Sequence, residues 1–468
     1  MTAGLTRRHI LQQAGAGFGG LALQSLLGAD GVLSSANPMA PRAPLFAPKA
    51  KSVIFLFMYG GPSHVDLFDP KPALAKWHGQ PIPLWKKEDS FMVGKTKNVA
   101  MKSPYKFAKH GDAGIDMAEV YPNLARHADD LCMIRSMHAE SNNHGPALFQ
   151  MNSGFIQAGR PSMGSWVTYG LGSESQNLPG FVVLQSGPRG PRGGAVNWAS
   201  GFLPTSYQGV PLRGSGDPIL NISSPKGVTA QRQRDCIDAV RDLNLKRLVE
   251  TGDQEISTRI SAYEMAYRMQ SSAPELIDLS GESAATLKLY GVDKDKPSFA
   301  RNCLLARRLV ERGSRFVQLY HTNWDSHGGP GENLEGDFEK VCREVDQGQA
   351  ALVHDLKARG LLDDTLVIWG GEFGRTPMGE NRDTTGRNHH IDAFTMWFAG
   401  GGVKRGAIVG ETDELGFNPA SDRCHVHDIH ATILHLLGIE HEKLTFKFQG
   451  RDFRLTDVHG ELIHKMLA

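Results

Sequence analysis

The 468-residue sequence predicts an α/β fold: a doubly wound, mostly parallel sheet with helices on both faces, and a helical and loop insertion. Short apolar runs rich in β-branched residues predict buried strands. Strand and helix alternate along most of the chain, which is the order of a parallel sheet with crossover helices. The predicted strands are 52–58, 131–134, 180–184, 315–320, 365–369 and 394–399, and the predicted helices include 117–128, 298–312, 336–359 and 427–437.

The composition is that of a globular protein, with 40% hydrophobic and 22% charged residues. The formal net charge of +1 gives no overall attraction to nucleic acid, so none is expected as a partner. The five cysteines are far apart and form no C-x-x-C motif, which argues against a zinc ribbon or a dense disulfide framework.

The N-terminus indicates export. Arg7 and Arg8 precede an uncharged, glycine-rich apolar segment at 14–27, which is too short to span a bilayer comfortably. We interpret residues 1–36 as a twin-arginine (Tat) signal that directs the chain to the periplasm or beyond, with the Tat machinery as a partner. The alternative is a chance arginine pair before an amphipathic helix. The proline-rich residues 37–50 are expected to form a linker, and no other segment suggests a stable membrane span.

Polar residues follow the predicted strands 52–58 and 131–134. Asp66 lies beyond the first strand, on a loop that Gly60 and Gly61 allow to bend. The loop after the second strand carries Ser141, Asn143 and His144 and leads into a helix. Because the N–H groups at a helix N-terminus are free, this loop is a candidate anion site.

Two further strands are followed by candidate ligands. The strand 315–320 leads to Asp325 and His327. The strand 365–369 leads to Glu372, and a polar, glycine-punctuated loop after it carries His389 and His390. Because the carboxyl ends of parallel strands meet at one edge of a sheet, we expect these groups to converge. The predicted metal ligands are Asp66, Asp325, His327, Glu372, His389 and His390.

Carboxylate and imidazole ligands predict a divalent metal, with zinc, manganese and calcium all left open. Such a metal would act as a Lewis acid toward a phosphoryl or sulfuryl oxygen. Arg375 and Arg387 either clamp the anion or form structural ion pairs. Residues 51–468 are expected to form one domain, with an insertion at about 186–297 that is rich in glycine, proline and serine at its start.

Five segments carry a resemblance to a known family. They are F-M-Y-G-G-P-S-H-V-D-L-F-D-P-K-P at 57–72, N-W-D-S-H-G-G at 323–329, W-G-G-E-F-G-R-T-P at 369–377, G-R-N-H-H at 386–390 and V-H-D-I-H-A-T-I-L-H-L-L-G-I at 426–439. The chain resembles a large family of Tat-exported, sulfatase-like bacterial proteins of unknown function within the alkaline phosphatase superfamily. The resemblance implies a doubly wound sheet, one or two divalent metals, and a nucleophile that attacks phosphate or sulfate esters.

The resemblance can be followed residue by residue. Asp325 and His327 resemble the Asp and His metal pair of the superfamily, and His389 or His390 resembles its late metal histidine. Glu372 takes the place of an aspartate that a histidine follows, but Phe373 stands here instead. At the position of the sulfatase nucleophile stands His144, and no formylglycine motif is present. His144 is then open to two further roles, as an additional metal ligand or as a phosphohistidine-type nucleophile.

Two functions follow from these residues. The first is an exported metal-dependent hydrolase of phosphate or sulfate esters on small molecules or glycans. In it Ser141 or a metal-bound water attacks, His144 acts as acid or base, Arg375 assists, and Asn143 and Arg387 bind the anion. The second is a catalytically silent relative that binds anionic glycans, which the departure at Phe373 and the absent nucleophile favour. Neither the substrate nor the oligomeric state follows from the sequence.

Overall fold

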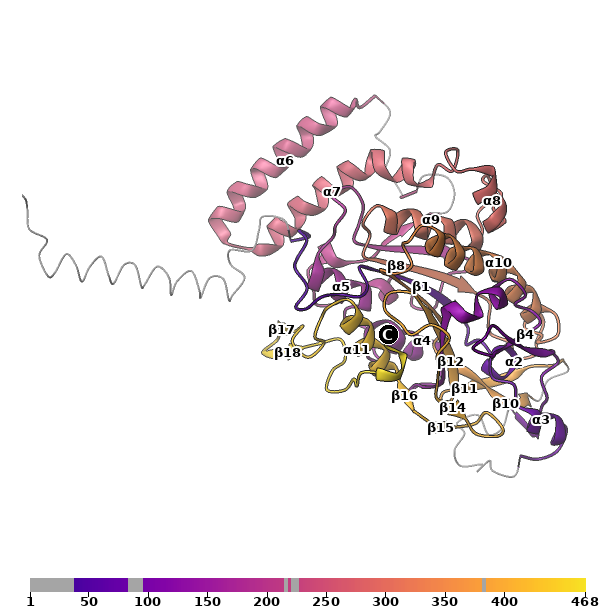
Figure 1. Ribbon diagram of the computed structural model, residues 1–468. Coiled ribbons are helices and arrows are strands. Elements are labelled where there is room, and N and C mark those ends of the chain that lie inside the picture. Colours follow the sequence, from indigo (N-terminus) through magenta and orange to yellow (C-terminus); the bar gives the residue numbers. More distant parts are fainter. Residues whose placement is uncertain (1–37, 83–95, 214–217, 220–226, 381–383) are drawn as a thin grey trace, which may run out of the picture.

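The computed structural model describes residues 38–82, 96–213, 218–219, 227–380 and 384–468 (Figure 1). The predicted signal at residues 1–36 lies outside this part of the chain.

A nine-stranded sheet forms the centre of the protein, in the order β13-β5-β12-β9-β1-β8-β6-β7, with β16 beside β5. Every neighbouring pair is parallel except the two that β12 forms with β5 and β9. This confirms the mostly parallel sheet. The strands are β1 (Ser52–Tyr59), β5 (Leu131–His138), β6 (Phe181–Ser186), β7 (Val210–Leu212), β8 (Phe316–Thr322), β9 (Thr365–Gly370), β12 (Phe394–Ala399), β13 (Ile408–Val409) and β16 (Cys424–His425).

Helices cover both faces of this sheet, as the predicted doubly wound arrangement requires. Side chains alternate along a strand, so Phe55 and Phe57 of β1 enter one core while Ile54 and Leu56 enter the other. Helices α4 (His144–Ser153), α5 (Met163–Leu171) and α11 (Val426–Leu436) complete the first core, and α9 (Phe299–Glu311) and α10 (Asp337–Ala358) complete the second (Figure 1).

The predicted insertion contains both sheet and helix. Its β7 pairs in parallel with β6 and forms an edge of the central sheet. Helices α6 (Ala230–Thr251) and α7 (Gln254–Ile277) form a hairpin in which α6 is outermost and α7 contacts α9, and α8 (Ala284–Tyr290) leads back to α9 (Figure 1). In the described part of the chain, no helix combines the length and the apolar character needed to cross a membrane.

The structure corrects two predicted elements. Residues 117–128 do not form one helix, because Pro122 disfavours helical geometry at the residue before it. Instead β4 (Ile115–Ala118) pairs with β3 (Phe107–His110), and a 3₁₀ helix spans Leu124–Asp130. Part of the predicted loop after β9 is a β-hairpin.

That hairpin belongs to a small sheet of β2 (Thr96–Ala100), β10 (Gly374–Glu380) and β11 (Arg387–His390). In its register Arg375 lies opposite His389, so the hairpin brings both side chains to the same place. The remaining short elements are α2 (His64–Leu67), α3 (Pro72–Lys76), β14 (Glu411–Thr412), β15 (Pro419–Ser421), β17 (Phe446–Phe448), β18 (Arg451–Phe453) and the 3₁₀ helices Gly194–Trp198, Thr205–Tyr207 and His464–Met466.

Candidate metal centre

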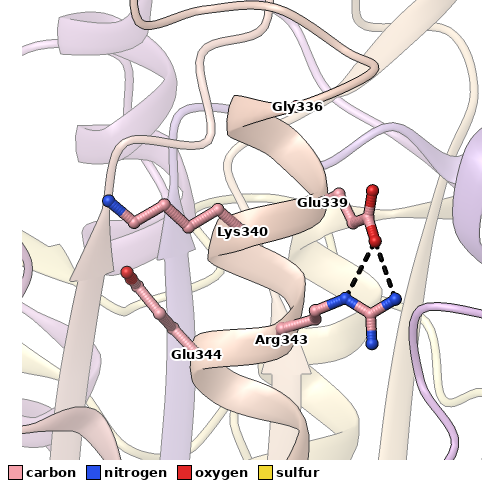
Figure 2. A pocket seen from close by; sticks show the side chains of 5 residues that line it. All are labelled: Gly336, Glu339, Lys340, Arg343 and Glu344. Carbon is pink, nitrogen blue, oxygen red and sulfur yellow. Dashed lines mark hydrogen bonds and ion pairs between the residues drawn. The ribbon is translucent and has the colours of Figure 1, made fainter.

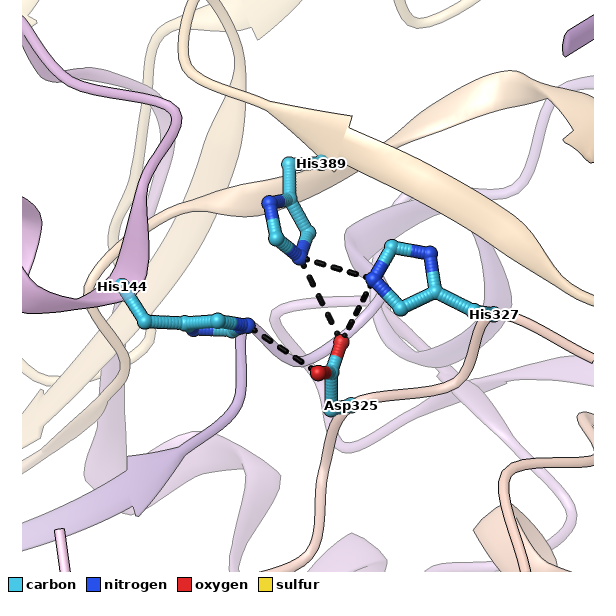
Figure 3. A group of neighbouring side chains, drawn as sticks. All are labelled: His144, Asp325, His327 and His389. Atoms are coloured by element: carbon cyan, nitrogen blue, oxygen red, sulfur yellow. Dashed lines mark hydrogen bonds and ion pairs between the residues drawn. The ribbon is translucent and has the colours of Figure 1, made fainter. Parts of the chain in front are cut away.

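Four side chains meet beyond the carboxyl ends of the central strands: His144, Asp325, His327 and His389 (Figure 3). His144 is the first residue of α4, Asp325 and His327 follow β8, and His389 comes from β11. One donor atom from each lies within 4.8 Å of the others. The convergence predicted from the sequence is therefore present for Asp325, His327 and His389, and the fourth donor is His144, which was predicted as a catalytic residue.

The donor atoms are close enough for one cation to contact all of them. The Asp325 carboxylate lies 2.9 Å from His327 Nε2, 3.3 Å from His389 Nε2 and 3.1 Å from His144 Nε2. The two nitrogens of His327 and His389 are 2.9 Å apart. Tetrahedral zinc with bonds near 2.1 Å separates its ligand atoms by about 3.4 Å. The spacing of the four donors therefore suits a transition-metal ion after small shifts.

Hydrogen bonds behind the three rings fix which nitrogen faces the centre. His144 Nδ1 donates to Glu372 at 2.6 Å, His327 Nδ1 to Glu380 at 2.7 Å, and His389 Nδ1 to the Asn142 carbonyl at 2.7 Å. We assign these donors because a carboxylate or carbonyl only accepts. A neutral ring then presents an unprotonated Nε2 to Asp325, which also only accepts.

Groups that only accept hydrogen bonds do not stabilise one another. His144 Nε2 is buried, and its 3.1 Å contact with Asp325 Oδ2 does not have the geometry of a hydrogen bond. A cation at the centre would satisfy that nitrogen together with the Nε2 atoms of His389 and His327, although His327 Nε2 also has a long 3.4 Å contact with Arg375 Nη1. Carboxylate and carbonyl groups on the far nitrogens are also the usual way in which proteins orient histidine ligands. The residues present therefore fit a bound metal.

The charges around the centre set the protonation of Asp325 and of the rings beside it. Burial opposes ionisation of Asp325, but Arg375 and the neighbouring histidines hold its pKa well below the usual range. Burial lowers the pKa of His389 to about 3, so its ring is neutral at physiological pH. Burial also acts to lower the pKa of His144, but the carboxylates of Asp325 and Glu372 outweigh it and raise the pKa. Without a cation this ring therefore tends to hold a second proton, which a bound metal would displace.

Arg375 places a permanent positive charge at the edge of the centre. It is fully buried, and its Nη2 lies 2.6 Å from Asp325 Oδ1. Its Nε donates to the Gly61 carbonyl at 2.8 Å, and Nη1 donates to the Arg387 carbonyl at 3.1 Å. These bonds fix the guanidinium beside Asp325, where it balances part of the carboxylate charge.

Phe373 forms an apolar wall of the centre. Its ring centroid lies 4.9 Å from that of His144 and 4.5 Å from that of His389. The position where the family resemblance implies a histidine is therefore occupied by a group that packs against two donors and supplies none.

Other residues predicted as ligands from the sequence do not reach the centre. Asp66 instead binds Arg387, with 2.6 Å from Oδ2 to Nε and 3.0 Å from Oδ1 to Nη2, and both residues are fully buried. Arg387 is therefore in an ion pair and not directed at an anion. His390 Nε2 donates to the Phe417 carbonyl at 2.5 Å. Glu372 accepts a hydrogen bond from His144 Nδ1, on the side of the ring away from the centre.

The two remaining predicted residues shape the loop before α4. Ser141 Oγ accepts the Asn143 N–H at 3.2 Å, and Asn143 Oδ1 accepts the Gly145 N–H at 3.2 Å as the cap of α4. In the described structure no hydrogen bond joins either side chain to the four donors.

Sequence reasoning missed the groups that orient the rings. Glu380 lies 53 residues from the His327 that it holds, so no local pattern connects them. The Asn142 carbonyl is a backbone group and has no sequence signature. Gly60 donates its N–H to Glu372 at 3.0 Å, and an added Cβ there would lie 2.5 Å from the Asp325 nitrogen. In the sequence, Gly60 and Gly61 after β1 partly indicated that this loop packs closely against the backbone at Asp325.

Replacing Glu372 by glutamine is expected to weaken metal binding by about 10- to 100-fold, the usual range for a group that orients a metal ligand. The amide still accepts from His144 Nδ1, but it has no charge to raise the basicity of the ring. Competition with a metal indicator measures the affinity, and Glu339→Gln on the exposed face of α10 is the control. Wild-type affinity in Glu372→Gln would contradict the orienting role.

The buried His64 is expected to make the protein sensitive to acid. Burial lowers its pKa to about 4 from 6.5, and Nε2 donates to the Gly416 carbonyl at 3.1 Å. The pKa of His64 is lower in the folded than in the unfolded protein. The contribution of its neutral ring to the free energy of unfolding is therefore fully present above pH 6.5 and is lost as the pH falls toward 4. The loss amounts to ~3 kcal/mol. In His64→Gln this part of the pH dependence of the unfolding free energy should disappear. Equilibrium denaturation at several pH values measures it, and an unchanged slope would refute the prediction.

A second polar region lies on the outer face of α10 and is lined by Gly336, Glu339, Lys340, Arg343 and Glu344 (Figure 2). Arg343 Nη2 lies 2.7 Å from Glu339 Oε1, one helical turn away. Exposed pairs of this kind are typical of a solvated helix surface. We assign no function to it.

Several solved structures are similar to this chain at low sequence identity. The lipoteichoic acid synthase LtaP from Listeria monocytogenes is 10% identical, with 92% of this chain and 80% of that chain covered and a TM-score of 0.35. The sulfatase PsFucS1 from Pseudoalteromonas sp. is 12% identical, with 84% and 68% covered and a TM-score of 0.34. The alkaline phosphatase from the Antarctic bacterium TAB5 is 11% identical, with 84% and 99% covered and a TM-score of 0.34.

No curated protein matches the sequence. One family does match, described as "Protein of unknown function (DUF1501)", over residues 50–467. The chain therefore belongs to the DUF1501 family.

Proposed function

We propose that this protein is a metal-dependent hydrolase of phosphate or sulfate esters. The observation that carries the proposal is the convergence of three imidazole nitrogens and one carboxylate beside a fixed arginine. Three imidazoles and one carboxylate favour zinc or manganese over calcium, which prefers oxygen ligands.

When bound, the cation supplies a Lewis acid for an ester oxygen and for the attacking water. The chain's own residues supply the rest. Arg375 adds a positive charge that favours an anionic substrate, and Phe373 limits the access of solvent to His144 and His389. Asp325 keeps part of its side chain exposed, so the centre can be approached from solvent on that side.

Water is the nucleophile that best fits this centre. In the described part of the chain, no hydroxyl or thiol side chain is bonded to the four donors. His144 has one nitrogen bonded to Glu372 and the other directed at Asp325, so it serves as a ligand and not as an acid or base. Ser141 lies three residues before His144 and is a second candidate, which its replacement by alanine would test.

The alternative is a protein that binds anionic glycans without turnover. The specific observation in its favour is that four protein donors fill a tetrahedral metal site, as is usual for structural zinc. In that case the protein binds anionic polysaccharide saturably and cleaves no ester.

Metal removal separates the two functions. We expect protein purified without chelator to hydrolyse aryl phosphate, phosphonate or sulfate esters, to lose the activity on chelation, and to regain it when zinc or manganese is added back. Bound metal without hydrolysis of any of these esters, together with saturable glycan binding, would favour the alternative. A chain that binds no metal would refute the centre itself.

We also propose export through the Tat pathway, on the basis of Arg7, Arg8 and the apolar segment after them. The four donors come from distant parts of the chain and meet only after folding, and a route that carries folded proteins would keep such a centre loaded. Replacing Arg7 and Arg8 by lysine should retain the protein in the cytoplasm. Unchanged fractionation of that variant would refute the proposal.

A further inference from the structure

A second group of metal-binding side chains lies apart from the first centre. Glu140, His425 and His427 each place one donor atom within 4.8 Å of the other two. His425 ends β16, and His427 is in the first turn of α11. Glu140 comes from the loop between β5 and α4, which also carries Asn142 and leads to His144.

His427 has a buried nitrogen without a hydrogen-bond partner. The side chain is 3% exposed, and its Nε2 donates to the Gly154 carbonyl at 2.7 Å. That bond fixes the proton on Nε2 and leaves Nδ1 as a lone pair. Among the described residues no group donates to this Nδ1. Because an unpaired buried acceptor costs free energy, the nitrogen is suited to an external ligand.

His425 and Glu140 are separated by the distance that a metal would need. His425 Nε2 lies 3.5 Å from Glu140 Oε1, which is too long for a strong hydrogen bond. It is close to the spacing of about 3.4 Å between two ligands of tetrahedral zinc. The Glu140 N–H donates to Gln150 Oε1 at 3.0 Å, so the backbone of this residue is anchored to α4.

Glu140 and His425 line a polar cavity of about 620 Å³, and His427 lies behind them. Four carboxylates line it together with two histidines, and the negative charge favours cations. The cavity leaves room for water molecules at the open positions of a metal. The lining residues with ionisable side chains are Glu140, His425, Asp428, Glu442, His459 and Glu461.

We propose that Glu140, His425 and His427 bind a second divalent transition-metal ion, of the class of zinc, with water at the remaining positions. Two imidazoles and one carboxylate form a common ligand set for such ions. Binding through Nε2 requires His425 to carry its proton on Nδ1. The long 3.3 Å contact from the His427 N–H to that Nδ1 is then given up. The Glu140 loop continues through Asn142 to His144, so a cation here also restrains two groups of the first centre.

The test is the number of zinc ions bound after removal of all metal and dialysis against zinc. Glu140→Gln with His425→Asn removes two ligands, while asparagine keeps the ability of residue 425 to cap α11. We expect two equivalents in wild type and one in this double variant. Glu442→Gln, which lines the same cavity, should keep two.

His389→Gln separates the two centres. It should lose the first ion and keep the second, and combining it with the double variant should leave none. The second site would be overturned if Glu140→Gln/His425→Asn still bound two equivalents of zinc. It would also be overturned if wild type bound a single equivalent that only His389→Gln removed, and the first centre would then stand. Wild type that binds no zinc would refute both sites. Circular dichroism confirms that each variant is folded.

Discussion

Replacing His389 by glutamine is expected to weaken metal binding at the first centre by at least ~100-fold, more than the loss of an orienting group, and to abolish ester hydrolysis. The same replacement at His390 is expected to leave both close to wild type. The two residues are adjacent and have the same side chain, so the pair is a matched test of the centre.

The reason is the direction of each ring. His389 Nε2 lies 2.9 Å from His327 Nε2 and 3.3 Å from Asp325, and the Asn142 carbonyl holds its other nitrogen. The ring of His390 faces the opposite side of β11 and donates to the Phe417 carbonyl. A glutamine at 390 can still donate to that carbonyl, so the fold is expected to be retained.

Metal content after dialysis and the rate of hydrolysis of an aryl ester measure the two effects. Circular dichroism and the unfolding free energy show whether each variant is folded. Equal loss of metal in both variants would mean that folding, and not ligation, is affected. Loss in His390→Gln alone would show that the centre has been assigned to the wrong histidine.

The sequence was sufficient to predict the sheet and most of the donors. Asp325, His327 and His389 each follow a strand that apolar runs and glycines mark clearly, and parallel strands place such residues at one edge. His144 was predicted as a catalytic group because it stands where the family resemblance places the nucleophile. The structure places it among the donors, since its Nδ1 is held by Glu372.

The role of Asp66 could not be predicted from the same pattern. It also follows a strand, but the short α2 turns its carboxylate toward Arg387, 321 positions along the chain. A sequence pattern identifies the loop on which a side chain lies and not the direction in which it points. Glu380 could not be predicted either. Its role is to accept a hydrogen bond from His327, which is distant in the sequence.

The buried pair of Asp66 and Arg387 leads to the second large effect. Replacing Asp66 by asparagine is expected to lower the free energy of unfolding by ~3–5 kcal/mol, because it leaves a buried guanidinium without its counter-charge. Both residues are fully buried, and the pair has two short contacts. The amide has nearly the same shape, so the loss is one of charge and not of packing.

Chemical denaturation measures the loss, and Arg387→Gln in the same chain supplies the control. With both charges removed no unpaired ion remains, so the double variant should be more stable than Asp66→Asn alone. Asp66 is separate from the four donors, and folded Asp66→Asn should therefore keep its metal at the first centre. If Asp66 were a metal ligand, Asp66→Asn would lose metal with little change in its free energy of unfolding. Adding Arg387→Gln would then restore neither the metal nor the stability. Stability and metal content together thus distinguish a structural ion pair from a ligand.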